Sequence, residues 1–366
     1  MQWIESLFAS KEAMGILFRK HHFVFAVGIF LISCGRGIVN DAPVKVVHPQ
    51  KVLSLTAEQK SNPNFEECLQ IYQMNIVSDS ILVMGEQSAN EGDYMFRAYS
   101  CNTFKYLGSF IRKGRADREM LHPRIVSMNN CYKDLYIYDM SLNIKAAVDV
   151  KNSTMKPLPS FKMFPSLLES VWEWLPLSDS LFFIGNQEVG DELTYKSVDG
   201  QGNTIKKFQP FKGINCMTNA TYLSEQLLGN PKQMKVAQVM LFSPQVNIYD
   251  LEKETIVTYA VDRRYRQWKS VLNRNMNKNT MSYYNGATAS ADYIFMSYSP
   301  LTLSQIVSQE PHSTSIQIFD WDGHWLYDIK VNESIGAMAY DGVHKSLYAV
   351  DKAEGRIVRY ALGDIL

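Results

Sequence analysis

The feature that most constrains the fold of this chain is a short hairpin pattern that recurs along it. Each copy has a run rich in Val, Ile, Tyr and Phe, often closed by Asp, then a turn and a second run of the same kind. Such runs, bounded by Asp, Asn and Gly, predict strands joined in hairpins. Six copies are recognisable, at residues 81–107, 135–148, 181–205, 246–259, 315–329 and 346–360.

The spacing of the six copies predicts the number of sheets. About 320 residues divided by six give about 53 per copy, and a four-stranded propeller blade takes about 40–50. Five blades would leave too much loop in each, and no seventh copy is recognisable. We therefore expect an all-β fold, a six-bladed β-propeller of four-stranded antiparallel blades. Stretches with helical period are few and short, and helices are expected only at residues 165–172, 224–228 and 266–275.

The last copy predicts how the ring closes. Only six residues follow Tyr360, so the chain ends without room for a fourth strand. Residues 44–55, VKVVHPQKVLSL, form a strand candidate near the other end that has no hairpin partner nearby. Because an open ring exposes unpaired strand edges, we expect this N-terminal strand to complete the last blade.

The N-terminal region has the pattern of an export signal. Residues 23–33, FVFAVGIFLIS, are the only continuous apolar run, and Arg19 and Lys20 stand just before it. Its eleven residues are fewer than the about 18 needed to cross a bilayer, but they suit the apolar core of a signal peptide. We predict a signal peptide over residues 1–33.

A cysteine follows directly after the apolar run. The sequence Leu31-Ile32-Ser33-Cys34-Gly35 resembles the lipobox of bacterial lipoproteins. The resemblance implies that the Cys34 sulfur is diacylglycerylated, that cleavage occurs before Cys34, and that the new amine is acylated. Several acyl chains, at about 0.8 kcal/mol per buried CH₂, would hold the protein on a membrane. We expect residues 34–43 to form a lipidated tether and residues 44–366 to form the propeller.

Charge excludes one class of partner. The chain has 37 Lys and Arg against 37 Asp and Glu. Removal of residues 1–33 takes away three basic and two acidic residues, which leaves 34 basic and 35 acidic residues, a net charge of −1. Nucleic-acid binding usually requires a basic surplus, so no nucleic-acid partner is expected. We expect the single propeller domain to be monomeric.

A loop after the first copy carries a family resemblance. Leu107-Gly108-Ser109-Phe110 runs into KGRADRE at residues 113–119. With the lipobox and the six repeats, this resembles the TolB-like six-bladed propeller lipoproteins of Bacteroidetes, which often read G-x-G-P-x-E here. Gly114 and Glu119 keep their places, whereas Ala116 and Asp117 stand where Gly and Pro would be. The resemblance covers residues 44–366, but it does not carry the family's backbone turn over to this loop.

The resemblance also bears on location. Surface-exported lipoproteins of Bacteroidetes tend to have acidic residues closer to the lipidated cysteine than Asp41 lies to Cys34. The resemblance therefore implies a bacterial cell-envelope protein, anchored to the outer membrane and facing the periplasm.

A search for local catalytic or metal-binding patterns predicts no catalytic residue, metal site or cofactor. No two histidines have HxH or HExxH spacing, and no Gly-x-Ser-x-Gly elbow is present. Disulfides are possible among the four cysteines after Cys34, and single buried thiols are an equal alternative. These cysteines are Cys68, Cys101, Cys131 and Cys216.

Two groups of residues are candidates for ligand binding. Trp172 and Trp174 lie two residues apart in a predicted strand, so both indoles point to one side and could stack on a sugar; packing between blades is the alternative. Arg263 and Arg264 begin the strongest basic cluster, which could grip an anionic partner or form a solvated insertion.

Together these patterns predict a lipid-anchored, extracytoplasmic propeller that acts as a non-enzymatic binding module for a protein or a glycan. The alternative is a metal-dependent hydrolase or lyase whose ligands come from separate blades around the central channel. Its candidate ligands are Glu173, Asn186, Asn219 and Asp292.

The lipid anchor is testable. We expect labelled palmitate to be incorporated into the full chain and to be lost in Cys34→Ala, because the thioether of the diacylglyceryl group forms on that sulfur. Gel fluorography of immunoprecipitated protein measures the label. Labelling of Cys34→Ala at the level of the unaltered chain would refute the anchor.

Overall fold

The computed structural model describes residues 40–61, 71–78, 80–86, 90–125, 135–139, 141–142, 144–150, 152, 154–157, 171–178, 180–186, 194–211, 224–266, 276–308 and 311–366. The chain divides into two units, Met1–Gly37 and Ile38–Leu366, and every described residue lies in the second. The account below concerns that unit alone.

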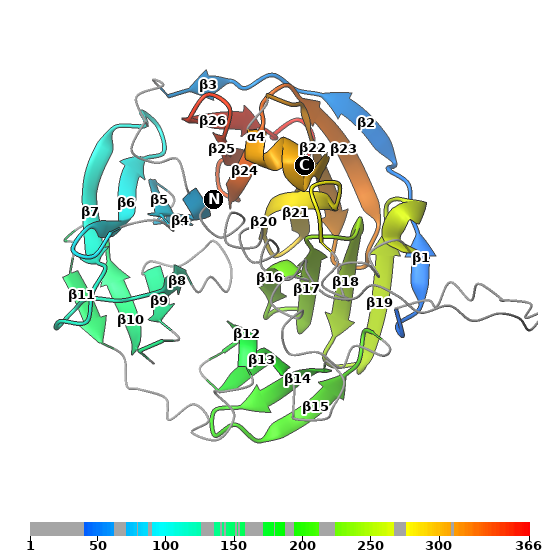
Figure 1. Cartoon of the computed structure of the whole chain (residues 1–366), viewed down its shortest axis with the longest axis horizontal. Coiled ribbons are helices and arrows are strands. Elements are labelled where there is room, and N and C mark those ends of the chain that lie inside the picture. Colours follow the sequence, from blue (N-terminus) through cyan, green and yellow to red (C-terminus); the bar gives the residue numbers. More distant parts are fainter. Residues whose placement is uncertain are drawn as a thin grey trace, which may run out of the picture. The chain divides into compact units, whose positions relative to one another are not determined.

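Six sheets of four or five strands make up this unit, and they are arranged as the blades of a propeller (Figure 1). Blades one to three are β4 (Ile71–Val77), β5 (Ile81–Glu86), β6 (Tyr94–Ser100) and β7 (Tyr106–Arg112); β8 (Pro123–Ile125), β9 (Leu135–Asp139), β10 (Ile144–Asp149) and β11 (Thr154–Pro157); and β12 (Val171–Pro176), β13 (Leu181–Asn186), β14 (Thr194–Asp199) and β15 (Thr204–Phe208).

Blades four to six are built in the same way and borrow strands from the N-terminal segment. They are β16 (Ser224–Asn230), β17 (Lys235–Met240), β18 (Gln245–Asp250), β19 (Thr255–Ala260) and β1 (Val44–Val46); β20 (Met281–Ala289), β21 (Tyr293–Thr302), β22 (Thr314–Asp320), β23 (Trp325–Val331) and β2 (Lys51–Ser54); and β24 (Ile335–Asp341), β25 (Ser346–Asp351), β26 (Arg356–Ala361) and β3 (Gln59–Lys60). The six-bladed all-β prediction is confirmed.

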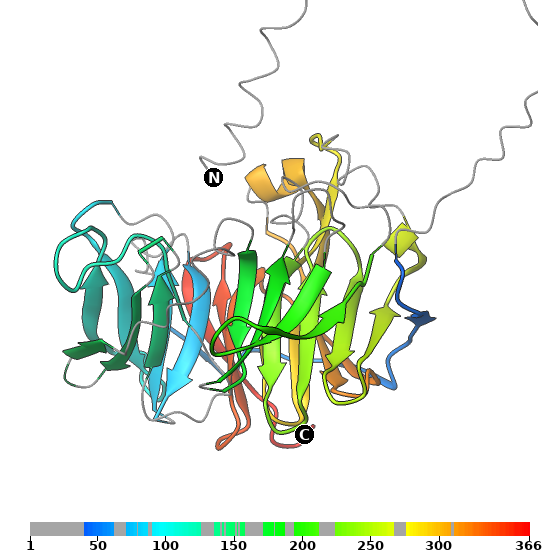
Figure 2. The same ribbon diagram turned by 90° about the horizontal axis from the view of Figure 1, so that it is seen from below.

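The first strand of each blade lies nearest the centre of the ring, and the fourth lies at the rim (Figure 1). In the side view the strands run across the ring from one face to the other (Figure 2). Helix is confined, within the described residues, to η1 (Arg263–Arg266) and α4 (Leu303–Ser308).

Aspartates close the third strand in four blades, and they explain the sharpness of the turns that follow. In blade three, Asp199 Oδ1 accepts hydrogen bonds from the backbone N–H of Gln201 and of Asn203, both at 2.8 Å. Asp149, Asp250 and Asp320 bond to turn amides in the same way. An aspartate that hydrogen-bonds its own turn is a local sequence signal, which is why the hairpins could be recognised from sequence.

The core lies between blades rather than inside one of them. Each hydrophobic cluster of the described residues joins the facing sides of two neighbouring blades. Between blades three and four, for example, Phe183 lies 4.8 Å from Tyr249, centroid to centroid, and between blades five and six Phe295 stacks on Tyr340 at 4.4 Å. Large aromatic rings suit this position because the gap between two sheets is about 10 Å wide.

The N-terminal segment 40–61, which we call the belt, runs along the rim (Figure 1). It begins at Asn40, whose side-chain oxygen accepts a hydrogen bond from Gln245 Nε2 at 3.0 Å, while Asp41 N donates to Pro210 O at 2.8 Å. Contacts with the blades therefore start within the segment that the sequence analysis assigned to the tether.

The belt then adds strands to successive blades. β1 pairs in parallel with β19, and β2 pairs in parallel with β23, as fifth strands of blades four and five. Two lysines of the belt lie over rim tyrosines: Lys45 Nζ is 5.7 Å from the ring centroid of Tyr259, and Lys51 Nζ is 5.8 Å from that of Tyr327. The belt thereby covers backbone edges that would otherwise be open.

The closing strand is β3, which pairs antiparallel with β26 as the fourth strand of blade six. The prediction that an N-terminal strand completes the last blade is confirmed, but the segment predicted for this role, residues 44–55, was wrong. Residues 44–55 reach only blades four and five, because the belt follows the rim and meets blade six later. Gln59 Nε2 also donates to Asn102 O of blade one at 3.0 Å, so β3 bridges the two ends of the ring.

An ion pair between the exposed Lys60 and the buried Glu333 holds β3 in place. Lys60 Nζ lies 2.7 Å from Glu333 Oε1, and the Tyr360 hydroxyl donates to Glu333 Oε2 at 2.7 Å. Burial alone would raise the pKa of Glu333, but the hydrogen bonds from Lys60 and Tyr360 outweigh it and hold that pKa below its usual value. The carboxylate is thus kept charged for Lys60.

Of the three predicted helices, one is wrong, and the other two segments lie mostly outside the described residues. Residues 224–228 belong to β16, a strand paired with the fully buried β17, so sheet pairing overrides the helical preference of Glu-Gln-Leu-Leu. Of the segment 165–172, residues 165–170 lie outside the described residues and Val171 begins β12. Of 266–275, Arg266 ends η1 and residues 267–275 lie outside the described residues.

We expect Lys60→Met to lower the free energy of unfolding at pH 7 by about 1–3 kcal/mol, because it leaves the buried Glu333 carboxylate without its cation. Lys51→Met is the matched control, since it removes a lysine of the same belt that meets only a tyrosine ring. Denaturant unfolding followed by tryptophan fluorescence measures both. Equal effects of the two variants would contradict a specific role for the pair.

The same carboxylate predicts a pH dependence. A carboxyl with a lowered pKa in the folded state contributes stability that is present above its unfolded pKa of about 4.3 and is lost as pH falls. We expect Glu333→Gln to be less stable than the unaltered chain at pH 7 and the difference to shrink as pH drops from 5 to 3. Thermal melts across this range measure it, and a constant difference would refute the assignment.

Candidate interaction surface

A binding surface needs exposed side chains that the fold does not already use. Three groups of charged and aromatic side chains stand out among the described residues. They lie at the seam between blades four and five, around η1, and at the rim of blade one.

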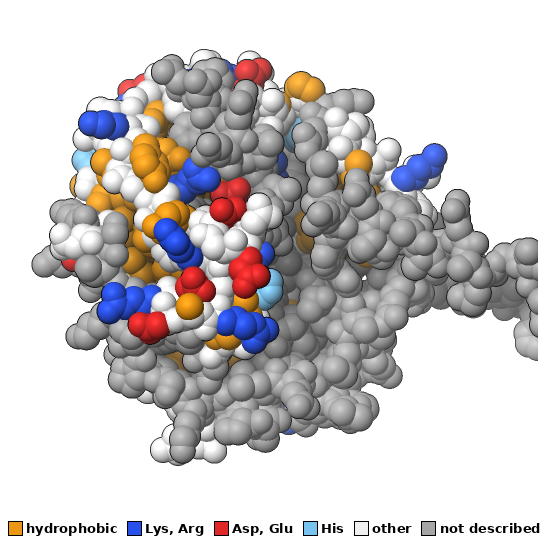
Figure 3. All heavy atoms as spheres, turned by 60° about the vertical axis from the view of Figure 1, so that its left-hand side comes forward, with side chains coloured by type: hydrophobic (Ala, Val, Ile, Leu, Met, Phe, Trp, Pro, Cys, Tyr) orange, Lys and Arg blue, Asp and Glu red, His pale blue; other side chains and the backbone are white. Residues whose placement is uncertain are grey.

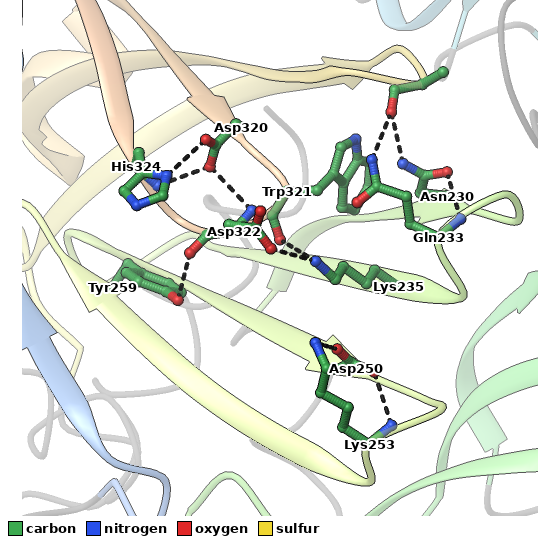
Figure 4. A network of polar contacts seen from close by, with 11 residues as sticks. Asn230, Gln233, Lys235, Asp250, Lys253, Tyr259, Asp320, Trp321, Asp322 and His324 are labelled. Atoms are coloured by element: carbon green, nitrogen blue, oxygen red, sulfur yellow. Dashed lines mark hydrogen bonds and ion pairs between the residues drawn. The ribbon is translucent and has the colours of Figure 1, made fainter.

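The seam between blades four and five is a network of polar contacts that the fold itself satisfies (Figure 4). Lys235 Nζ of blade four lies 2.6 Å from Asp322 Oδ1 in the last turn of blade five, and the Tyr259 hydroxyl donates to Asp322 O at 2.7 Å. The hydrogen bond from Lys235 holds the pKa of Asp322 below its usual value. Lys253 pairs with Asp250 at 3.0 Å. The contacts of Lys235 and Tyr259 with Asp322 hold the two blades together, whereas the Lys253–Asp250 pair lies within blade four.

The basic cluster predicted from sequence is partly used by the fold. Arg264 pairs with Asp262 at 2.7 Å, donates to the Tyr298 hydroxyl at 3.2 Å, and lies 5.5 Å from the ring centroid of Tyr283. It links η1 to the first two strands of blade five. Arg263 is exposed at the start of η1. Arg264 thus contributes to the packing of η1 on blade five, whereas Arg263 is left exposed. Ligand binding by either arginine stays a prediction.

The other sequence candidates are placed less fully. Trp172, Glu173 and Trp174 are in β12, the innermost strand of blade three, and Asn186 ends β13, but their side chains lie outside what the structure describes. Asn219 lies outside the described residues altogether. Asp292 is exposed in the turn between β20 and β21 and not on an inner strand.

Cysteines contribute little to any site. Cys101 is buried in the turn that follows β6, whereas Cys68, Cys131 and Cys216 lie outside the described residues. No group of three or more His, Cys, Asp or Glu side chains that could hold a metal ion occurs within the described part of the chain.

The rim of blade one carries exposed side chains of a different kind. In β7, Tyr106 is 50% exposed and Leu107 is 52% exposed. The register between β6 and β7 shifts at this point, so that Tyr99 faces Tyr106 and Ala98 faces Gly108. Leu107 is the extra residue of this β-bulge, which explains why its side chain turns away from the sheet.

An arginine and a tyrosine extend this surface along the strand. The guanidinium carbon of Arg112 lies 4.9 Å from the ring centroid of Tyr94, and Arg112 donates to the Tyr94 hydroxyl at 3.3 Å. Both side chains are exposed. The pairing orients the guanidinium without burying it, which leaves the remaining donors of Arg112 accessible.

The loop after β7 is shaped by the two residues that match the family pattern. Glu119 Oε2 accepts a hydrogen bond from Ala116 N at 2.9 Å, and a Cβ on Gly114 would come within 1.9 Å of the same oxygen. Gly114 N in turn donates to Met120 O at 3.0 Å. The loop therefore keeps Gly114 and Glu119 in contact although Ala116 and Asp117 replace Gly and Pro, and it presents Arg115 and Arg118 to solvent.

We call the exposed side chains of Tyr94, Tyr106, Leu107, Arg112, Arg115 and Arg118 the blade-one surface. On this side of the molecule, hydrophobic side chains gather among Lys and Arg, with Asp and Glu between them (Figure 3).

The rims of the other blades differ. The belt covers β19 and β23 and completes blade six, whereas β7, β11 and β15 pair only with their inner neighbours among the described residues. Of these three, β15 has two consecutive lysines, and its Lys206 donates to Leu251 O at 2.7 Å. Lysines are a common means of protecting an edge strand. Blade one has the longest of the three uncovered strands, with seven residues against four and five.

The six sheets define the chain as a six-bladed β-propeller. The family described as "TolB-like 6-blade propeller-like" matches residues 61–341. The chain belongs to this TolB-like six-bladed propeller family, which confirms the family resemblance seen in the sequence.

The solved structures that resemble this chain share little sequence identity with it. A Bacteroides fragilis protein described as exported is 11% identical with a TM-score of 0.49, over 84% of this chain and 87% of that one. Raptor from Chaetomium thermophilum is 10% identical with a TM-score of 0.45 over 80% of this chain, which spans only 27% of Raptor. No curated protein matches the chain.

None of the helices in the described residues has the length and apolar character needed to span a membrane.

Sequence reasoning identified these blade-one segments as strands and as a family loop but missed their exposure. One signal was available: residues 105–119 hold five Lys and Arg against two Asp and Glu in a chain with no net charge. Which of these side chains face solvent depends on the bulge and on whether a fifth strand covers β7, which none does among the described residues, and neither can be read from local sequence.

The loop makes a stability prediction. We expect Gly114→Ala to lower the free energy of unfolding by about 1–3 kcal/mol, because its methyl group displaces the Glu119 carboxylate. Gly363→Ala is the control, since no atom lies within 4 Å of that Cβ position. In a Glu119→Ala background the cost of Gly114→Ala should fall, as a double-mutant cycle would measure. An undiminished cost would show that the two residues do not interact.

Proposed function

We propose that this protein is a lipid-anchored, extracytoplasmic propeller whose blade-one surface binds a protein partner. The propeller fold supports a binding or interaction role in general. The finer parts of the proposal, the anchor and the partner, rest on separate observations.

The observation that carries the binding role is the set of large side chains left exposed at the rim of blade one. Tyr106 and Leu107 are each about half exposed, and the Tyr94–Arg112 pair lies on the same pair of strands. Tyrosine and arginine are among the residues that contribute most to protein–protein binding, since each combines a large contact area with hydrogen bonding. A rigid sheet presents them at little entropic cost.

The anchor is supported by the N-terminal sequence. A basic pair, an eleven-residue apolar run and a cysteine follow one another at residues 19–34. This order supports export followed by acylation of Cys34, and the proposed location is the bacterial cell envelope, on the outer membrane and facing the periplasm. An anchored module would meet its partner at the membrane surface, where tethering raises the local concentration of both.

Site-specific photocrosslinking tests the surface. A benzoylphenylalanine at position 107 of the full chain, expressed in its own host, should give a discrete protein adduct on irradiation. Position 205 is the matched control, because Ile205 is also a large apolar residue, 53% exposed, on the fourth strand of another blade. We expect the adduct at position 107 to disappear when Tyr106 and Arg112 are both changed to Ala.

Adducts of equal yield at positions 107 and 205 would show general stickiness and refute the proposal. So would the absence of any adduct at position 107, or an adduct that survives the Tyr106→Ala and Arg112→Ala changes.

A further inference from the structure

We propose that the blade-one surface recognises an acidic segment of its partner, read by side chains rather than by strand addition. This inference rests on the proposed function and deepens it. Three observations support it: the local charge, the contacts that the acidic residues of the loop already make, and the interruptions in the edge of β7.

The charges of this region are in positive excess. Residues 105–119 hold five basic residues and two acidic ones. The turn that hydrogen-bonds to Lys113 adds the exposed Glu91 and Asp93, so the local net charge is +1, whereas the full chain has none. Four of the five cations are exposed: Lys105, Arg112, Arg115 and Arg118. A concentrated positive region attracts an acidic partner and speeds its encounter.

The two acidic residues in this stretch leave the cations in excess, although Glu119 also interacts electrostatically with Arg112. The Glu119 carboxylate is turned onto the loop, where it accepts the hydrogen bond from Ala116 N. Asp117 Oδ2 lies 3.7 Å from Arg118 Nε, with the two side chains 95% and 76% exposed. An exposed pair at this distance contributes little, so Arg118 stays available to a partner.

The arginines favour anionic groups with paired oxygens over neutral hydrogen-bonding groups. A guanidinium offers donors in a planar fork that matches both oxygens of a carboxylate. Arg112, Arg115 and Arg118 lie within seven residues on one strand end and its loop. We therefore assign to this surface a partner segment with several Asp or Glu residues, joined to at least one apolar side chain that can cover Leu107.

The edge of β7 is a poor template for an added strand. The bulge at Leu107 interrupts one end. Near the other end, Ile111 has φ of 56°, which is unusual for a β-branched residue and breaks the extended course of the backbone. Strand addition needs a continuous row of edge N–H and C=O groups, and β7 keeps only a short run between the two interruptions. Recognition is left to the side chains.

Selection from a random twelve-residue phage library tests the inference. The target is the full chain in detergent, immobilised through a C-terminal tag, at 50 mM NaCl. We expect enriched peptides to carry net negative charge and at least one large apolar residue. Synthetic copies should bind about fivefold or more weakly at 300 mM NaCl, since screening weakens exposed charge pairs.

A charge-reversal pair separates the site from the charge of the whole molecule. We expect Arg115→Glu with Arg118→Glu to weaken the selected peptides at least about tenfold, because attraction becomes repulsion. Lys207→Glu with Lys232→Glu is the control: both lysines are exposed on other blades, and the net charge changes equally. Circular dichroism melts verify that each variant is folded.

Four outcomes would overturn the inference: no enrichment, neutral or basic enriched peptides, salt-independent binding, or equal weakening by the two charge-reversal pairs. A partner crosslinked at position 107 together with any of these would leave the proposed function in place and remove only the acidic partner. A missing crosslink would remove the proposed function itself.

Discussion

The structure depends on closing the ring at its rim. Six radial sheets pack face to face through clusters such as Phe295 on Tyr340, and each sheet needs neighbours on both sides. Blade six has only three strands from the C-terminal end of the chain, so the ring holds together when β3 pairs with β26. The pair of Lys60 with Glu333 and the hydrogen bond of Tyr360 to Glu333 add to the backbone bonds of this short strand, which Glu58 N and Ser61 N extend at its two ends.

The route of the closing strand makes the rim asymmetric. To reach blade six, the belt crosses blades three to five and adds β1 and β2 to two of them. Blades one to three receive no such strand among the described residues. In blade one, the bulge at Leu107 and the irregular backbone at Ile111 interrupt the edge of β7 and so disfavour pairing with an added strand. The side chains of Tyr106 and Leu107 are left exposed there. The exposed surface proposed for binding is thus a consequence of how the ring is closed.

Much of the fold could be predicted because its signals are local. A strand followed by an Asp turn, as at Asp199 or Asp320, carries its own hydrogen bonds and needs no distant partner. The innermost strands were harder to recognise: β16 was predicted as a helix, because Ser-Glu-Gln-Leu-Leu becomes extended only through pairing with β17. The candidate surface was missed for the same reason, since exposure of Tyr106 and Leu107 depends on what the rest of the chain leaves uncovered.

The amino-acid sequence by itself determined the repeating unit, the number of blades and the family. These follow from turn chemistry and spacing, which are properties of the chain read along its length. Only the tertiary structure decided that Gln59–Lys60 closes the ring and that, within the described part of the chain, no further strand covers the rim of blade one. The closing strand is selected by pairing with β26, about 300 positions away in the sequence. The exposure of the rim strands depends on which blades the belt covers.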